Sequence, residues 1–173
     1  MIGPDLRTRP VRDLPRRTVY QPQPGDLLLP CGTASLHRAA IVIHGDVPLV
    51  ATGAFALLKP RSRVHGLALL ALLHHRVLGE QLWALTSGTT RARAVSASKI
   101  PALRVPQIAP GQRSALAARV ERLLYAQATF HYPGLNVPIV EYWQDGTLSQ
   151  WQQRAGELVE EVQEMIEEIL RLA

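Results

Sequence analysis

The C-terminal residues carry the pattern that most limits how this chain can fold. From Thr147 to Leu172 there is no proline, and apolar residues recur in alternating steps of four and three positions. This spacing predicts one amphipathic helix whose apolar seam covers about three heptads. The seam consists of Trp151, Ala155, Leu158, Val162, Met165, Ile169 and Leu172. Because soluble proteins rarely leave such a stripe in water, the helix must pack on its own chain, on a second copy or on a partner.

The polar side of the same helix is acidic. Six glutamates lie between Glu157 and Glu168, and like charges on two identical parallel helices would repel each other. A parallel pairing of two such helices is therefore disfavoured, and the basic surface of residues 1–125 matches the acidic tail better. We expect a homodimer in which a helix over 112–128, the tail or both make the contact, and a monomer with an internally packed tail is the main alternative. The interface residues predicted from the seam are Trp151, Leu158, Val162, Met165 and Ile169.

Charge is divided unevenly along the 173 residues. Residues 1–125 contain 17 Lys and Arg against 6 Asp and Glu, whereas residues 126–173 contain 2 against 8. A concentrated positive field suits a polyanion such as nucleic acid. A genome rich in arginine codons is the simpler explanation, because 17 of the 19 basic residues are arginine.

Cysteine content and hydropathy indicate the compartment. The single cysteine, Cys31, excludes an internal disulfide and any zinc site that needs a cysteine pair, which favours a reducing environment. The longest apolar run, 67–73, spans seven residues, whereas a membrane helix needs about twenty. No signal peptide is recognisable, so we expect a cytoplasmic protein without membrane contact.

The chain begins with an arm and continues with short apolar runs. Residues 1–23 are rich in arginine and interrupted by four prolines, which prevents a continuous helix. Short runs rich in Val, Ile and Leu follow between turn residues, and they predict the strands of one small mixed sheet. These runs are 27–29, 39–43, 48–51 and 54–58.

Beyond Pro60 the pattern becomes helical. We expect one helix from Gly66 to about Arg76 and a second to about Leu85, with Gly79 as the break. A basic loop, a strand at 102–105 and a helix over 112–127 follow. The predicted fold is therefore α/β (α+β), a small sheet with packed helices, followed by the helix over 112–127 and an acidic C-terminal helix.

The sequence contains no recognisable catalytic set. Motifs for nucleotide binding, zinc proteolysis and serine hydrolysis are absent, so we expect no enzyme, no cofactor and no metal site. Cys31 with His37 or His44 as base is a weak nucleophile candidate, because a lone cysteine is usually a small buried hydrophobe. His74 and His75 are adjacent, so on a helix they point about 100° apart and cannot chelate together.

A basic segment after the second helix is the best candidate for a binding surface. Short hydroxyls and arginine forks gather there, and these groups suit phosphate oxygens and guanine edges. A loop that is polar only for solubility is the alternative. The segment contains Thr89, Thr90, Arg91, Arg93, Ser96, Ser98 and Lys99, and the next candidates are Thr33, Ser35 and Arg38.

The order of several short motifs resembles a known family. Pro24–Leu29, followed by Gly32-Thr33 and 38–42, resembles the opening of a target recognition domain from the DNA specificity subunits of type I restriction-modification systems. Segments 67–73 and 82–90 resemble two later motifs of that domain. The run from Val95 to Arg113 resembles the segment before its spacer helix. The resemblance covers about residues 24–127.

This resemblance implies a non-enzymatic role in reading DNA. Residues 24–111 would form a recognition domain for half of a bipartite duplex site, and residues 112–128 would form the spacer helix. The chain has room for one such domain where full specificity subunits carry two, and residues 129–173 have no counterpart. It would be a half-size specificity subunit that directs a DNA methyltransferase and, where one is present, a restriction subunit. The alternative is a protein-interaction or scaffold module that uses the aromatic, acidic tail.

Overall fold

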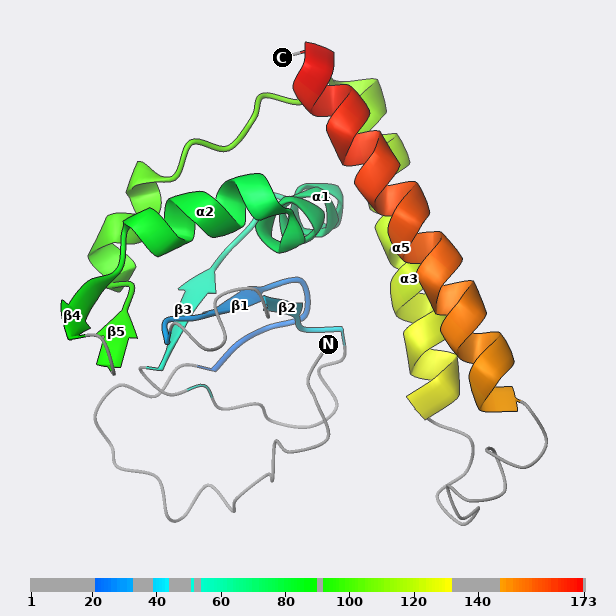
Figure 1. Cartoon of the computed structure of the whole chain (residues 1–173), viewed down its shortest axis with the longest axis horizontal. Helices are drawn as coiled ribbons and strands as arrows, with labels where there is room; N and C mark the ends of the chain where they lie inside the picture. The colour runs from blue at the N-terminus through cyan, green and yellow to red at the C-terminus, as the bar shows by residue number, and fades with distance from the viewer. Residues whose placement is uncertain are drawn as a thin grey trace. The chain divides into compact units, whose positions relative to one another are not determined.

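The computed structural model describes residues 21–32, 39–43, 51, 54–89, 92–131 and 147–172 (Figure 1). The chain divides into two compact units, residues 1–106 and residues 107–173. The N-terminal unit combines helices with short antiparallel strands, and the C-terminal unit is helical where it is described. The fold class is therefore α+β. The described helices include none that is long and apolar enough to cross a bilayer.

The centre of the N-terminal unit is strand β1 (Leu27–Pro30), which is buried along its length. It pairs antiparallel with β2 (Ala40–Ile41) on one side and with β3 (Phe55–Leu58) on the other. Leu28 lies opposite both Ala40 and Leu57. These strands confirm three of the predicted apolar runs. Of the fourth run, 48–51, only the buried Ala51 is among the described residues.

A tight turn leads into β1. Gly25 has a φ of +93°, a conformation that glycine adopts without steric cost. Its N–H donates to the carbonyl of Val42 at 2.8 Å, and the carboxylate of Asp26 accepts from the N–H of Gln23 at 2.9 Å. This turn at Pro24–Asp26 therefore orders the chain before the first strand.

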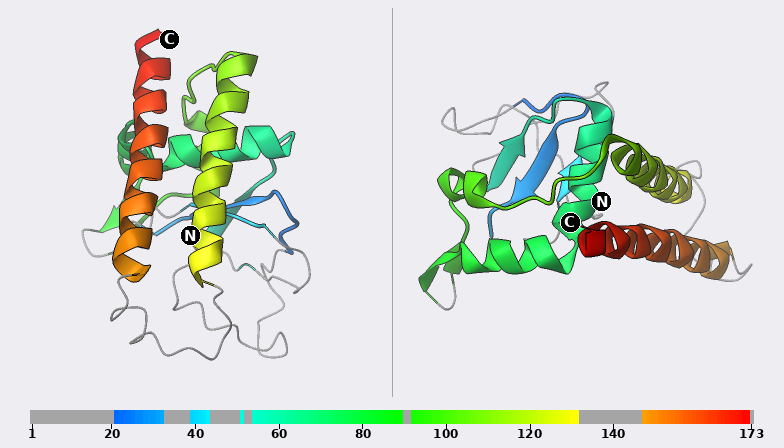
Figure 2. Two further views of the ribbon diagram at one scale, coloured as in Figure 1. Left: turned by 90° about the vertical axis from the view of Figure 1, so that its right-hand side faces the viewer. Right: turned by 90° about the horizontal axis from the view of Figure 1, so that it is seen from above.

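Helices α1 (Arg63–His74) and α2 (Arg76–Ala84) lie on the same side of this sheet (Figures 1 and 2). The predicted pair of helices is confirmed, but the predicted break at Gly79 is wrong. Gly79 is buried inside α2, and the chain changes direction at His75. The N–H of His75 donates to the carbonyl of Leu72, while its side chain accepts from the N–H of Val77, so one residue caps both helices.

Two further expectations are wrong. The described strands form two antiparallel sheets instead of one mixed sheet, and the second consists of β4 (Ser87–Thr89) and β5 (Ala92–Ala94). The predicted strand at 102–105 is replaced by a 3₁₀ helix, η3 (Ala97–Ala102), and an irregular segment. The side chain of Gln81 bonds both the N–H and the carbonyl of Arg104, so these groups have a partner without a neighbouring strand.

The C-terminal unit is a hairpin of two long helices, α3 (Pro110–His131) and α5 (Thr147–Leu172) (Figure 2). They run antiparallel, because Arg119 bonds to Met165 and Arg122 to Glu161. Both helices were predicted, although α3 extends further at each end than expected. Their buried apolar residues are Leu116, Ala117 and Val120 on α3 and Leu158, Val162, Ile166 and Ile169 on α5.

The seam of α5 packs within the chain. Leu158, Val162 and Ile169 are buried, and the sulfur of Met165 lies 3.0 Å from a guanidinium nitrogen of Arg119. The side chain of Trp151 lies outside the described residues. Because α3 covers the seam, the expectation that these residues meet a second copy is revised in favour of internal packing. Leu158, Val162 and Ile169 are therefore covered within the chain, whereas Leu172 at the end of the seam is exposed.

Candidate nucleic-acid interface

The predicted basic loop is largely a β-hairpin. Ser87 pairs with Ala94, Gly88 with Arg93, and Thr89 with Ala92. Gly88 has a φ of +117°, which side chains other than glycine rarely adopt. Pairing within segments of three residues is too short to leave an alternating pattern, and this explains why the sequence did not predict it.

The hairpin is joined to the end of β1. Gly32 forms a bridge with Ala94, and the N–H of Val95 donates to the carbonyl of Cys31 at 2.8 Å. The chain therefore brings Gly32, which precedes the candidate segment 33–38, next to the second hairpin strand. This contact ties the end of β1 to the hairpin.

Arg93 lies against an aromatic ring that the sequence analysis did not select. Its guanidinium carbon is 5.3 Å from the ring centroid of Trp83, a distance typical of a cation–π contact. Trp83 belongs to the last turn of α2, and half of its surface is exposed. The two residues are ten positions apart, so only the hairpin geometry reveals their contact.

One nitrogen of Arg93 is enclosed. Its Nε is shielded from solvent and has no hydrogen-bond partner among the described residues. Directly across the hairpin stands Gly88, which has no side chain to compete for space on that face. The Arg93 side chain is thus partly enclosed and lies against the indole of Trp83.

Lys99 lies at the same end of α2. Its ammonium donates to the carbonyl of Leu85 at 3.2 Å, two residues after Trp83. A cation at this position interacts favourably with the helix dipole and with the unpaired carbonyl groups at the C-terminus of the helix. Nearby, the hydroxyls of Ser96 and Ser98 are 2.8 Å apart at the start of η3. The structure therefore places both Arg93 and Lys99 near the C-terminal end of α2.

The remaining predicted binding residues can be located only in part. Thr89 is the last residue of β4, and its side chain is not described. The other candidates lie outside the described residues, and they are Thr33, Ser35, Arg38, Thr90 and Arg91.

Positive charge dominates the described part of the N-terminal unit. Seven basic residues stand against two acidic ones, Asp26 and Glu80, and Asp26 is buried. Such an excess creates a field that attracts polyanions. The basic residues are Lys59, Arg61, Arg63, Arg76, Arg93, Lys99 and Arg104.

The nucleophile and metal candidates have structural roles. Burial raises the pKa of the Cys31 thiol, which opposes the activation that a nucleophile needs. His74 Nε2 lies 2.8 Å from the carbonyl of Ala39, and His75 caps two helices. Within the described residues, no three His, Cys, Asp or Glu side chains come together as metal ligands. His37 and His44 lie outside these residues.

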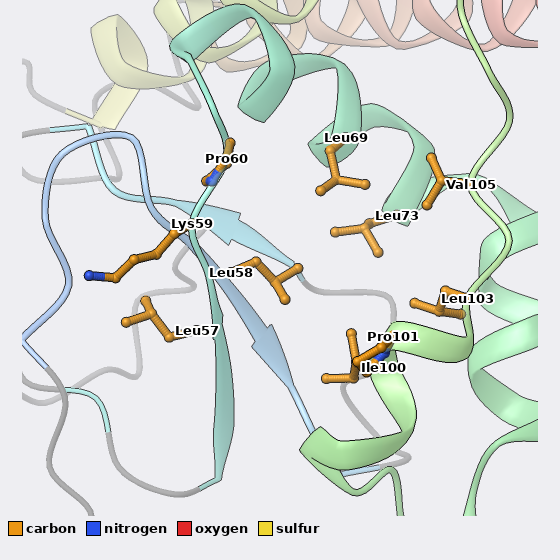
Figure 3. Close-up of a pocket in the computed structure, with 10 residues that line it drawn as sticks. All are labelled: Leu57, Leu58, Lys59, Pro60, Leu69, Leu73, Ile100, Pro101, Leu103 and Val105. Atoms are coloured by element: carbon orange, nitrogen blue, oxygen red, sulfur yellow. The ribbon is translucent and has the colours of Figure 1, made fainter.

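A separate groove of about 420 Å³ opens between β3, α1 and η3 (Figure 3). Its lining is apolar except for Lys59, whose ammonium points away from Leu103 and Val105 in Figure 3. A small-molecule site normally places several polar groups around one point. This groove lacks that arrangement, so the hairpin region is the better candidate site.

Comparisons with protein-family models, curated proteins and solved structures find no match to this chain.

Proposed function

We propose that this chain binds double-stranded DNA in a sequence-specific manner, with the β4–β5 hairpin and the residues around it as the contact surface. The observation that carries the proposal is the placement of Arg93 and Lys99 together at the end of α2, within a unit of high positive charge. Arginine forks pair with guanine edges, and lysines and hydroxyls contact phosphates.

The proposed role is that of a half-size specificity subunit. The motif order supports a target-recognition fold for the N-terminal unit, and α3 corresponds to the proposed spacer helix. The expected partners are a DNA methyltransferase, a restriction subunit where one is present, and a second copy of this chain. No cofactor is needed, and the expected compartment is the cytoplasm.

Titration against a random duplex library at about 50 to 100 mM salt tests this proposal. Binding that weakens steeply as salt increases is expected, because arginine–phosphate contacts release counterions. Absence of duplex binding, alone and with candidate methyltransferases, would contradict the proposal.

The double substitution Arg91→Ala/Arg93→Ala should weaken binding to the preferred duplex by several kcal/mol. This estimate takes about 1 to 3 kcal/mol for each arginine–guanine pair. The control is Arg61→Ala/Arg76→Ala, which removes the same charge from exposed positions of the same unit. Fluorescence anisotropy measures the affinities, and thermal unfolding checks that both variants fold. Equal losses in the two double variants would indicate a general charge effect instead of a contact by the hairpin.

The scaffold alternative now depends on a different surface. Because α3 covers the apolar seam, a partner would meet the outer face of α5, where Glu157, Glu160, Glu164 and Glu168 are exposed. Replacing these glutamates with glutamine would abolish partner capture under that alternative, while DNA binding by the hairpin would persist.

A further inference from the structure

We infer that Trp83 is a positioning residue that holds Arg93 for end-on recognition of a guanine in the major groove. This inference rests on the proposed DNA-binding function and deepens it. It names the base that Arg93 reads and the residue that prepares Arg93 to read it.

The first argument is the aromatic contact that restrains the Arg93 guanidinium. Trp83 supports Arg93 at 5.3 Å, and Gly88 leaves the facing position on the hairpin free of side-chain atoms. A free arginine loses side-chain entropy when it binds, whereas a stacked one has lost part of that freedom beforehand. The stack therefore prepares Arg93 for a contact that depends on orientation.

The second argument concerns which guanidinium nitrogens of Arg93 remain available to donate hydrogen bonds to a base. Nε of Arg93 is enclosed, so the side-on pairing that uses Nε and one terminal nitrogen is closed to a ligand. The remaining edge is the terminal pair, Nη1 and Nη2. Two parallel N–H donors on this edge match the O6 and N7 acceptors of guanine.

The third argument separates a base contact from a phosphate contact. A phosphate attracts any nearby cation and tolerates many orientations, so a flexible lysine serves there. An aromatic ring beside an arginine does not change the charge of the guanidinium, but it restrains the direction in which the guanidinium points. Trp83 lies in the last turn of α2 with half of its surface exposed, so its ring is accessible beside Arg93. Its placement is better explained by the arginine that it supports.

The test compares the preferred duplex, selected with the wild-type protein, with a scrambled duplex of equal length. Trp83→Ala should reduce the ratio of the two affinities by about tenfold or more. It removes no charge, so affinity for the scrambled duplex and the salt dependence should stay unchanged. Trp83→Phe retains an aromatic platform and should keep the ratio within about threefold of wild type.

Two further measurements identify guanine as the ligand. Arg93→Lys keeps the charge but loses the fork, so it should reduce the ratio as strongly as Trp83→Ala, and combining the two should add little. Replacing guanines of the preferred site by 7-deazaguanine, one at a time, removes a single acceptor. At one position the wild-type protein should lose affinity, and Trp83→Ala should be insensitive to the same replacement.

The outcomes separate the inference from the function on which it rests. If Trp83→Ala lowers both affinities equally, or leaves the ratio unchanged, the positioning role is wrong while DNA binding stands. If no 7-deazaguanine duplex weakens wild-type binding, the guanine assignment is wrong. If the wild-type protein binds no duplex, the proposed function itself fails. Circular dichroism checks that Trp83→Ala folds. If it does not fold, Trp83→Phe and Arg93→Lys are compared with the wild-type protein instead.

Discussion

The sequence and the structure suggest different roles for Cys31. In the sequence it is a lone thiol beside a turn, with two histidines in range as bases. In the structure its N–H and carbonyl both bond to neighbouring segments, and burial raises its pKa. Its backbone joins β1 to the hairpin, and its thiol is not activated as a nucleophile would be.

Alkylation of Cys31 by iodoacetamide tests this interpretation. Only the thiolate reacts, so a raised pKa moves the rate–pH curve of the folded protein to higher pH than that of the denatured protein. At pH 8 the folded protein should therefore react more slowly. Cys31→Ser removes the only thiol of the chain, so it measures the background reaction of iodoacetamide with other groups. Faster reaction of the folded protein would revive the nucleophile hypothesis.

At the scale of single residues, the sequence predicted the site only in part. Arg93 and Lys99 were selected because their chemistry is visible in the residue type. Trp83 was missed, because its contact with Arg93 depends on the fold that sets Arg93 opposite Gly88. Contacts made by the fold between distant positions leave no local pattern.

Secondary-structure elements were predicted best where their periodicity is long. The seam of α5 and the leucine-rich stretch of α1 and α2 each gave the correct element. The break between α1 and α2 was misplaced, because glycine is a general helix breaker whereas a histidine cap is a specific contact. The strand expected at 102–105 failed for a similar reason, since the Gln81 amide bonds the Arg104 backbone.

His75→Ala tests the shared cap. The substitution removes the acceptor for the Val77 N–H, which lies 3.3 Å from Nδ1, in a side chain that is almost completely buried. We expect the free energy of unfolding to fall by about 1 to 2 kcal/mol, the range for a lost helix cap. His75→Asn supplies another acceptor and should lose less. Urea denaturation measures both, and an equal loss would show that packing, not capping, is the role of His75.

At the scale of the whole molecule, the division of charge follows the division into units. Residues 1–106 contain 14 basic and 5 acidic residues, a net charge of +9, whereas residues 107–173 contain 5 and 9, a net charge of −4. Within the C-terminal unit, Glu161 of α5 forms an ion pair with Arg122 of α3. The sequence suggested this pairing of opposite charges, but it could not choose between an internal partner and a second copy.

Val162→Glu tests whether the two units are independent. Val162 is buried between α5 and α3, so a carboxylate there should destabilise the C-terminal unit by about 3 kcal/mol or more. The matched control is Val159→Glu, because Val159 is 41% exposed on the same helix and should tolerate the change.

Hydrogen exchange followed by mass spectrometry, with light scattering for the mass, separates the outcomes. Each unit has its own buried core, so Val162→Glu should accelerate exchange in α3 and α5 while β1 and α1 keep their protection. The mass should not change, because the seam already has its partner within the chain. Accelerated exchange throughout the chain would show that the N-terminal unit depends on the helical hairpin. A mass halved by Val162→Glu but not by Val159→Glu would restore the seam as a contact between two copies.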